Sequence, residues 1–331
     1  MRHPLTRRRL LSATTAALAA GALGLTSGRA SANSRAALQL SWLHSVQFAG
    51  SYIAQARGYW SERGLEVALH PGGPNAPVEP PVVSGQALVG ISAADYTAAA
   101  VAEGAPFRIL GVAMQKNPFA IASLPADPVA TPADLPGKRI GMALANTPVL
   151  QALCTLNSID IASIDIVPTL YDAAPLVSGQ VDCLLCWATD LPIAMARQGI
   201  PSRTMLMADH GYALHSQTYI ATTDAIATRR ADLVALLRGE ALGWMDYLAD
   251  PAAAAALTVA AYPDQGLDLS TQALQAEAQV PLMFSDLTAR HGFGWFTEET
   301  VAANIETLAL LGRSVTPDLW DRSILEEVHA R

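Results

Sequence analysis

Apolar residues follow two alternating patterns along the chain from about residue 36 onward. Short apolar runs predict β-strands, and the longer stretches between them show the three-to-four-residue spacing of amphipathic helices. Alternating strands and helices indicate a mostly parallel sheet covered by helices on both faces. In the first part of the chain the predicted strands are 36–40, 65–69, 87–92 and 107–114, and the predicted helices are 48–57 and 96–103.

The same alternation starts again near residue 131. Its predicted strands are 139–142, 164–170 and 181–187, and its predicted helices are 131–135, 149–156 and 173–178. After residue 225 the spacing predicts helices alone, at 229–248, 252–260, 269–279 and 298–311. Two α/β halves followed by a helical tail predict two lobes around a ligand cleft.

We expect lobe one to contain residues 36–120 plus 225–331, and lobe two to contain residues 121–224. Crossover strands are predicted near Ile121 and at 219–221. The 331 residues suffice for two such lobes, and 51% hydrophobic against 15% charged residues exclude an intrinsically disordered chain.

Residues 1–32 have the features of a cleaved export signal. A twin-arginine pattern at 6–11 precedes a weakly apolar stretch that ends at Leu25, and 30–32 is a small-x-small cleavage site. An ordinary secretory signal is the alternative. We expect a mature protein that begins near Asn33 and is soluble in the periplasm.

The charge balance excludes one class of partner. The formal net charge is -8, and it becomes -13 without residues 1–32, which hold five arginines and no acid. Such an acidic chain is repelled by phosphate backbones, so nucleic acid is not an expected partner.

The sequence gives no sign of metal, cofactor or catalytic chemistry. Cys183 and Cys186 have redox-motif spacing, but they lie in a predicted strand, where side chains three apart face opposite sides. Together with Cys154 they are interpreted as buried apolar residues. The sequence contains no P-loop, dinucleotide glycine fingerprint, HExxH or GxSxG motif. We therefore expect a protein that is not an enzyme and has no cofactor.

Aromatic and amide side chains gather where the predicted strands end. In open α/β sheets, ligands bind at the carboxyl ends of the strands. Aromatic faces beside neutral hydrogen-bonding groups suit a flat heterocycle better than an anion, whose sites more often contain Arg or Lys. The predicted ligand-binding residues are Trp42, Gln47, Phe48, Ser92, Tyr96, Gln115, Asn117, Asn146, Tyr171, Trp187 and Asp190.

Two acids among these strand ends have alternative interpretations. Asp190 can accept N–H bonds from an amino-pyrimidine edge, and the same carboxylate would repel a sulfonate. Alternatively, it faces solvent or caps the helix that begins at Leu191. Asp95 can equally be a ligand contact or the cap of the helix at 96–103.

Several segments, in order, resemble periplasmic binding proteins of the thiamine-pyrimidine-precursor-binding (ThiY-like) family. The similar segments are Trp42 with Gly50, then 54–67, 84–87, 104–106, 134–141 and 177–182. This resemblance implies a bilobed fold that closes on its ligand and delivers it to an ABC permease and ATPase complex. It also implies a monomer. The wider superfamily includes taurine, alkanesulfonate and riboflavin binders, which remain alternatives.

The resemblance also names a rival activity. Fungal pyrimidine synthases share this fold, and they carry a lysine and a histidine at positions that look like Ser92 and Tyr96 here. Their cysteine cluster has no counterpart in 211–220. These departures count against synthase activity. The chain also lacks the family's histidine in the block 46–50, and this leaves the exact pyrimidine ligand open. A periplasmic sensor subunit is a further alternative.

Overall fold

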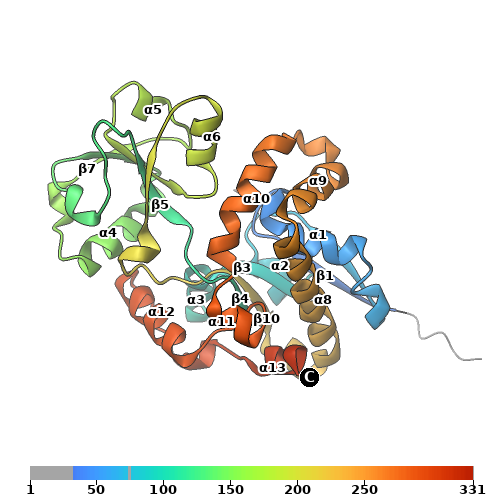
Figure 1. Ribbon diagram of the computed structural model, residues 1–331. Coiled ribbons are helices and arrows are strands. Elements are labelled where there is room, and N and C mark those ends of the chain that lie inside the picture. The colour runs from blue at the N-terminus through green and yellow to red at the C-terminus, as the bar shows by residue number, and fades with distance from the viewer. Residues whose placement is uncertain (1–32, 74–75, 331) are drawn as a thin grey trace, which may run out of the picture. The chain divides into compact units, whose positions relative to one another are not determined.

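The computed structural model describes residues 33–73 and 76–330 (Figure 1). The predicted export signal, residues 1–32, lies outside the described residues. The first of two five-stranded sheets has the order β2-β1-β3-β10-β4. Its strands are β1 (Ser34–Gln39), β2 (Leu65–His70), β3 (Val89–Ala93), β4 (Phe107–Met114) and β10 (Ser216–Thr222). β1 runs parallel to β2 and β3, whereas β10 is antiparallel to β3 and β4.

The second sheet repeats this plan in the order β7-β6-β8-β5-β9. Its strands are β5 (Phe119–Ser123), β6 (Arg139–Met142), β7 (Asp165–Pro168), β8 (Cys183–Trp187) and β9 (Arg203–Leu206). Here β5 is the antiparallel strand, paired with β8 and β9. Each sheet therefore receives its antiparallel strand directly after the chain leaves the other sheet. The two predicted crossover strands are β5 and β10.

One detail of the sequence-based division needs correction. β10 lies within 121–224, the range assigned to lobe two, yet it pairs with β3 and β4 of the first sheet. The return crossing therefore precedes Ser216. Strand β9 had no counterpart in the sequence-based assignment, because its four residues carry too short a pattern.

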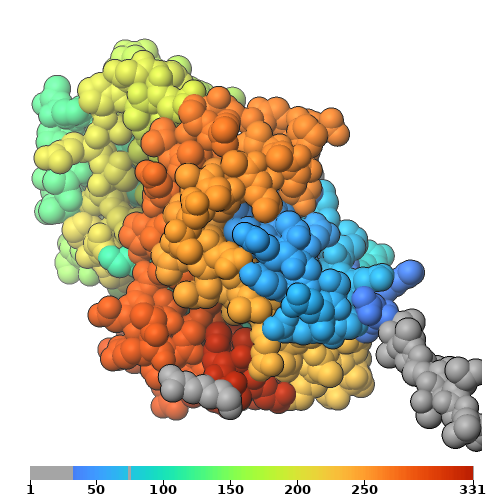
Figure 2. Space-filling model, turned by 45° about the vertical axis from the view of Figure 1, so that its right-hand side comes forward, coloured from blue at the N-terminus to red at the C-terminus, as the bar shows by residue number. Residues whose placement is uncertain are grey.

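The helices cover both sheets. They are α1 (Ala49–Ala56), α2 (Glu79–Val83), α3 (Ala94–Ala102), α4 (Thr147–Leu156), α5 (Ala174–Val177), α6 (Leu191–Arg197), α7 (Thr223–Thr228), α8 (Arg230–Ala249), α9 (Pro251–Ala261), α10 (Leu269–Met283), α11 (Asp286–His291), α12 (Glu298–Leu310) and α13 (Ser323–His329). Helices α8 and α9 pack on α1, and α13 packs on α8 and β4. Figure 2 shows the early segment that holds α1 lying against these later helices.

Helices α1 and α8 approach each other closely because glycines line their contact. A Cβ atom on Gly243 would overlap the backbone of Gly50, and one on Gly50 would overlap the ring of Trp244. Trp60 closes the same contact, since its indole N–H donates to the Leu236 carbonyl at 3.0 Å. The contact holds α8 beside the sheet and directs its buried face inward.

A buried acid, Glu240, lies on that inward face of α8. Its Oε2 accepts hydrogen bonds from the Tyr219 hydroxyl at 2.7 Å and from the Ser51 hydroxyl at 3.0 Å. The indole of Trp244 also donates to it, at 3.3 Å. Burial raises the pKa of Glu240 to about 7, and these three donors oppose the shift. The network joins α1, α8 and β10 through one carboxylate.

The three cysteines are free and buried, as predicted. Burial raises the pKa of the Cys183 and Cys186 thiols to about 12, so both remain protonated. Within the described part of the chain, no helix has both the length and the apolar character needed to cross a membrane.

Candidate functional site

The carboxyl edge of the first sheet begins with the loop after β1. This loop carries Trp42, whose side chain is 44% exposed. The Gly72 amide, just past β2, donates to the Trp42 carbonyl at 2.9 Å. A Cβ atom on Gly72 would overlap the backbone at Leu40 and Ser41, so glycine permits this close approach. Two strand ends thus fix the position of an exposed indole.

Next along this edge, β3 leads directly into α3. The N-cap residue is Ala93, so Asp95 lies in the first turn of the helix and is not its cap. Its Oδ1 is buried and has no hydrogen-bond partner among the described residues. Burial raises the pKa of Asp95, and the backbone N–H groups of Asp95 and Tyr96 oppose this shift. Tyr96, the following residue, is 67% exposed.

The chain returning from the second sheet brings Tyr212 to the same place. Ser216 pairs with Ala93, and the Ala94 amide donates to the His215 carbonyl at 3.1 Å. Tyr212 is fully buried, and its hydroxyl has no partner within the described ranges. Burial raises the pKa of Tyr212, and the nearby Asp95 and Tyr96 raise it further.

Aromatic rings continue from Tyr212 toward the second sheet. Tyr212 meets Phe119 edge to face, with ring centroids 6.3 Å apart, and Phe119 meets Trp187 in the same manner at 6.3 Å. Such edge-to-face pairs are favourable because the positive edge of one ring meets the negative face of the other. The predicted residue Trp187 is therefore linked to the carboxyl edge of the first sheet through two rings that the sequence analysis did not select.

The second sheet also presents an exposed tyrosine. Tyr171, in the turn after β7, is 71% exposed. The pKa of Tyr96 is raised by burial first, then by Asp95 and by Tyr171. Asn146 lies at the N-cap of α4 but makes no capping bond with its side chain.

Asp190 connects the second sheet to α10. It occupies the N-cap position of α6, yet its side chain makes no capping bond, so the capping alternative is wrong. The residue is exposed, which agrees with the other alternative, a side chain that faces solvent. Its Oδ1 instead accepts a bond from the Gln275 amide at 3.4 Å. Desolvation raises the pKa of Asp190. An ion pair at 3.1 Å between Arg197, at the end of α6, and Asp268, the N-cap of α10, joins these two helices.

Several predicted contact residues serve the fold instead. Phe48 is fully buried in the core, because the turn that contains it faces inward. Asn117 is buried and uses both ends of its amide: it donates to the Leu214 carbonyl and accepts from the Phe119 amide, each at 2.9 Å. It ties together the two segments that cross between the sheets. Both residues therefore serve the fold, and their assignment to ligand contact stays a prediction.

Two more predicted polar residues have protein partners for their side chains. The buried Ser92 hydroxyl donates to Glu79 Oε1 at 2.5 Å. Gln115 donates to the carbonyls of Val112 at 2.9 Å and Trp295 at 3.2 Å. Gln47 is half-buried in the turn before α1. Sequence reasoning missed Phe119 and Tyr212. Phe119 begins an apolar run, and Tyr212 directly follows Gly211. These two signals could have drawn attention to them.

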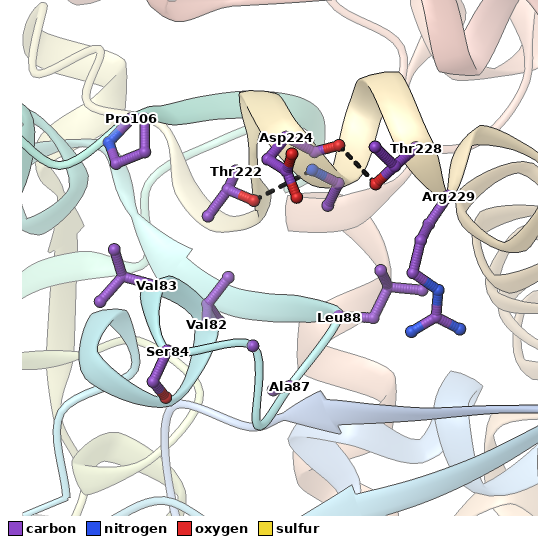
Figure 3. A pocket seen from close by; sticks show the side chains of 12 residues that line it. Val82, Val83, Ser84, Ala87, Leu88, Pro106, Thr222, Asp224, Thr228 and Arg229 are labelled. Carbon is purple, nitrogen blue, oxygen red and sulfur yellow. Dashed lines mark hydrogen bonds between the residues drawn. The ribbon is translucent and has the colours of Figure 1, made fainter.

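A pocket of about 300 Å³ lies at the opposite, amino edge of the first sheet (Figure 3). It is lined by Leu88 before β3, Pro106 before β4 and Thr222 at the end of the antiparallel β10. None of its lining residues is aromatic. No residue that the sequence analysis selected lines it.

Several polar groups of this pocket are already bonded within the protein. Arg229 donates to Asp232 at 2.8 Å, to the Ser34 hydroxyl at 3.2 Å and to the Arg35 carbonyl at 2.8 Å. Figure 3 shows the Thr222 hydroxyl accepting from the α7 backbone at 3.1 Å and the Thr228 hydroxyl donating to the Asp224 carbonyl at 2.8 Å. Its volume of about 300 Å³ exceeds the roughly 150 Å³ of a second pocket, which Gln115, Asn117 and Tyr212 help to line.

The described residues contain no group of three or more His, Cys, Asp or Glu side chains arranged to hold a metal ion. The candidate site consists of Asp95, Tyr96 and Tyr212 at the carboxyl edge of the first sheet, together with Tyr171 after β7 of the second sheet. Its chemistry is that of ring stacking and hydrogen bonding.

A family model described as NMT1/THI5 like matches residues 45–254, which is more than half of the chain. The riboflavin-binding protein RibY of Chloroflexus aurantiacus is 26% identical over 269 residues, which make up 78% of this chain and 75% of that protein. The 4-amino-5-hydroxymethyl-2-methylpyrimidine phosphate synthase of Legionella pneumophila is 29% identical over 156 residues, 46% of this chain and 47% of the synthase.

Among solved structures, the periplasmic aliphatic sulphonate binding protein SsuA from Escherichia coli is similar with a TM-score of 0.62 and 16% identity. The alignment covers 83% of this chain and 86% of SsuA. This similarity establishes the fold, and the predicted α/β periplasmic-binding-protein architecture is confirmed.

Proposed function

Because this chain belongs to the NMT1/THI5-like family, we propose that it is the solute-binding component of an ABC importer and captures a small flat heterocycle. A thiamine pyrimidine precursor is the first candidate for this heterocycle. The protein works in the periplasm as a monomer, closes on its ligand and presents the closed form to a permease and ATPase complex.

The observation that carries the proposal is that two exposed rings, Tyr96 after β3 and Tyr171 after β7, follow the carboxyl ends of strands in different sheets. Ligands bind at the carboxyl ends of strands in open α/β sheets, so these positions suit ligand contact. Two such rings supply flat faces for a flat molecule. The Asp190 carboxylate, at the N-cap position of α6, suits N–H donors.

The ligand class follows from the same groups. A heterocycle with N–H donors gains from a carboxylate, whereas a sulfonate is repelled by it. The relative named as a riboflavin-binding protein supports a flat heterocycle, and the relative named as a pyrimidine phosphate synthase supports a pyrimidine. The similarity to a sulphonate-binding protein keeps alkanesulfonates as the second candidate class.

Binding without turnover is the proposed activity. Ser92 stands where the synthases carry a lysine, and its hydroxyl donates to Glu79. Tyr96 stands where they carry a histidine. The cysteines are buried thiols with raised pKa, and this argues against nucleophilic chemistry.

The test uses the mature protein, purified from Asn33 onward. Its thermal unfolding is measured with 4-amino-5-hydroxymethyl-2-methylpyrimidine, riboflavin, taurine and an alkanesulfonate. A ligand at 100 times its dissociation constant stabilises the protein by about 2.7 kcal/mol. Stabilisation by a heterocycle alone supports the proposal, and stabilisation by a sulfonate alone overturns the ligand class. Turnover of a pyrimidine by the pure protein overturns the assignment as a binding protein.

A further inference from the structure

Two buried oxygen atoms at the carboxyl edge have no partner. Asp95 Oδ1 and the Tyr212 hydroxyl make no hydrogen bond within the described residues. Native structures leave few buried polar atoms unbonded, because each one costs free energy. An acid and a phenol left unbonded on neighbouring segments therefore require an explanation.

Backbone contacts bring together the two segments that carry these residues. Ser216 pairs with Ala93, and the Ala94 amide donates to the His215 carbonyl at 3.1 Å. Tyr212 precedes that bond by three residues and Asp95 follows it by one. The Asp95 carboxylate also contributes to the raised pKa of Tyr212, which agrees with this proximity.

The strand next to them is strained. The pairing of β10 with β3 shifts register between Ser216 and Thr218, and Gln217 between them has a left-handed φ of 49°. Its buried side-chain amide has no partner, and neither does the Thr218 hydroxyl. Strain and unused hydrogen-bonding capacity in one place are typical of functional sites.

From this arrangement, and resting on the proposed function, we infer that Asp95 and Tyr212 are the pair that determines ligand specificity. They bind the edge of a heteroaromatic ring on which a hydrogen-bond donor stands next to an acceptor. An amino group beside a ring nitrogen has such an edge, and so has a ring N–H beside a carbonyl.

The chemistry of the pair matches such an edge. A protonated carboxyl donates through its O–H and accepts through its carbonyl oxygen, so it forms two parallel hydrogen bonds with an adjacent donor and acceptor. Burial favours this neutral form of Asp95. The Tyr212 hydroxyl supplies one further donor or acceptor. A sulfonate offers acceptors only and leaves the carbonyl oxygen of Asp95 unbonded.

The experiment compares two substitutions at Asp95. Asp95→Asn keeps a donor beside an acceptor, and Asp95→Leu removes both while keeping the branching at Cγ. Dissociation constants are measured calorimetrically with riboflavin and with 4-amino-5-hydroxymethyl-2-methylpyrimidine. For whichever probe the wild type binds, we expect Asp95→Leu to weaken affinity about 10- to 100-fold and Asp95→Asn to remain within about 3-fold.

A matched pair of tyrosines tests the second residue. Tyr212→Phe removes an unbonded hydroxyl, so it weakens ligand binding about 5-fold or more and leaves the unliganded protein equally or more stable. Tyr219→Phe removes a hydroxyl bonded to Glu240, so it lowers the unfolding midpoint and leaves affinity unchanged.

The outcomes separate this inference from the proposed function. If the wild type binds a probe tightly while Asp95→Leu and Tyr212→Phe bind it equally well, the assignment of the pair is wrong and the binding function stands. Equal losses in Asp95→Asn and Asp95→Leu also overturn the pairing geometry. If the wild type binds neither probe, the inference and the proposed ligand class both fail.

Discussion

The two edges of the first sheet differ in which polar groups remain without a hydrogen-bond partner. The amino edge has a pocket of about 300 Å³, but Arg229 and the threonines around it are bonded within the protein. The carboxyl edge exposes Trp42 and Tyr96, and among the described residues Asp95 Oδ1 and the Tyr212 hydroxyl have no hydrogen-bond partner there. The two edges therefore differ in where buried polar atoms lack a partner, and not only in volume.

This difference follows from the topology. The carboxyl ends of β1 and β3 meet at one edge, and the antiparallel β10 begins there. The returning segment at 212–215 consequently arrives beside α3. At the amino edge, β10 ends and leads into α7, whose first turn is capped by Thr222. The loops after β1 and β3 and the segment before β10 meet at the carboxyl edge, whereas at the amino edge β10 continues directly into α7.

Another buried acid, Glu240, gives the largest expected effect. Its Oε2 accepts hydrogen bonds from three donors, while its Oε1, like Asp95 Oδ1, has no partner in the described ranges. The folded protein raises the pKa of Glu240 from 4.5 to about 7, so it binds more protons than the unfolded chain between these values. The contribution of Glu240 to stability therefore falls as pH rises through this window, by about 3 kcal/mol in total.

His215 contributes a pH dependence of stability with the opposite sign. Burial lowers its pKa from 6.5 to about 4, so its contribution to stability rises with pH between these values. The effect of Glu240 is isolated by comparing Glu240→Gln with the wild type at each pH. We expect the free energy of unfolding of the variant, relative to the wild type, to increase by about 3 kcal/mol from pH 4.5 to pH 8, measured by urea denaturation. A difference that stays constant with pH would contradict this assignment.

The sequence predicts those strands whose positions follow from the spacing of apolar residues. Residues 107–114 and 139–142 are strands with the predicted bounds, because alternation and flanking turns specify them locally. The same reasoning placed Trp42, Tyr96 and Tyr171 at strand ends, and all three are exposed there.

The sequence does not predict contacts made by the returning chain. Tyr212 joins the site because β10 enters the first sheet beside β3, and no local pattern reveals that pairing. Phe48 and Asn117 share the residue types of ligand contacts, but the core and the crossing segments use them. Residue type at a strand end predicts a candidate, and tertiary contacts decide whether its polar groups stay free.

The second prediction tests the exposed rings of the carboxyl edge. Tyr171→Ala removes one flat face, and we expect it to weaken binding of the cognate heterocycle by about 1–3 kcal/mol, roughly 5- to 150-fold. Tyr171→Phe keeps the ring and retains affinity. At the amino edge, Val83→Ala removes an exposed apolar side chain of the pocket and leaves affinity unchanged. Calorimetric titration measures all three. Equal losses in Tyr171→Ala and Val83→Ala would contradict the distinction between the edges.

The smallest expected effect comes from the amino edge. Arg229 holds the start of β1 through the Ser34 hydroxyl and the Arg35 carbonyl, and it pairs with Asp232 at 2.6 Å. Because its side chain is partly exposed, we expect Arg229→Ala to lower the free energy of unfolding by only about 1 kcal/mol.

The matched control is Arg35→Ala, at the same end of β1. Its guanidinium forms only an exposed pair with Glu66, at 3.4 Å, so the expected change is below about 0.5 kcal/mol. Urea denaturation separates the two variants, and calorimetry should show unchanged ligand affinity in both, since neither touches the carboxyl edge. A loss of affinity in Arg229→Ala would mean that the amino edge belongs to the ligand site, because the local bonds of Arg229 give no other route to such a loss.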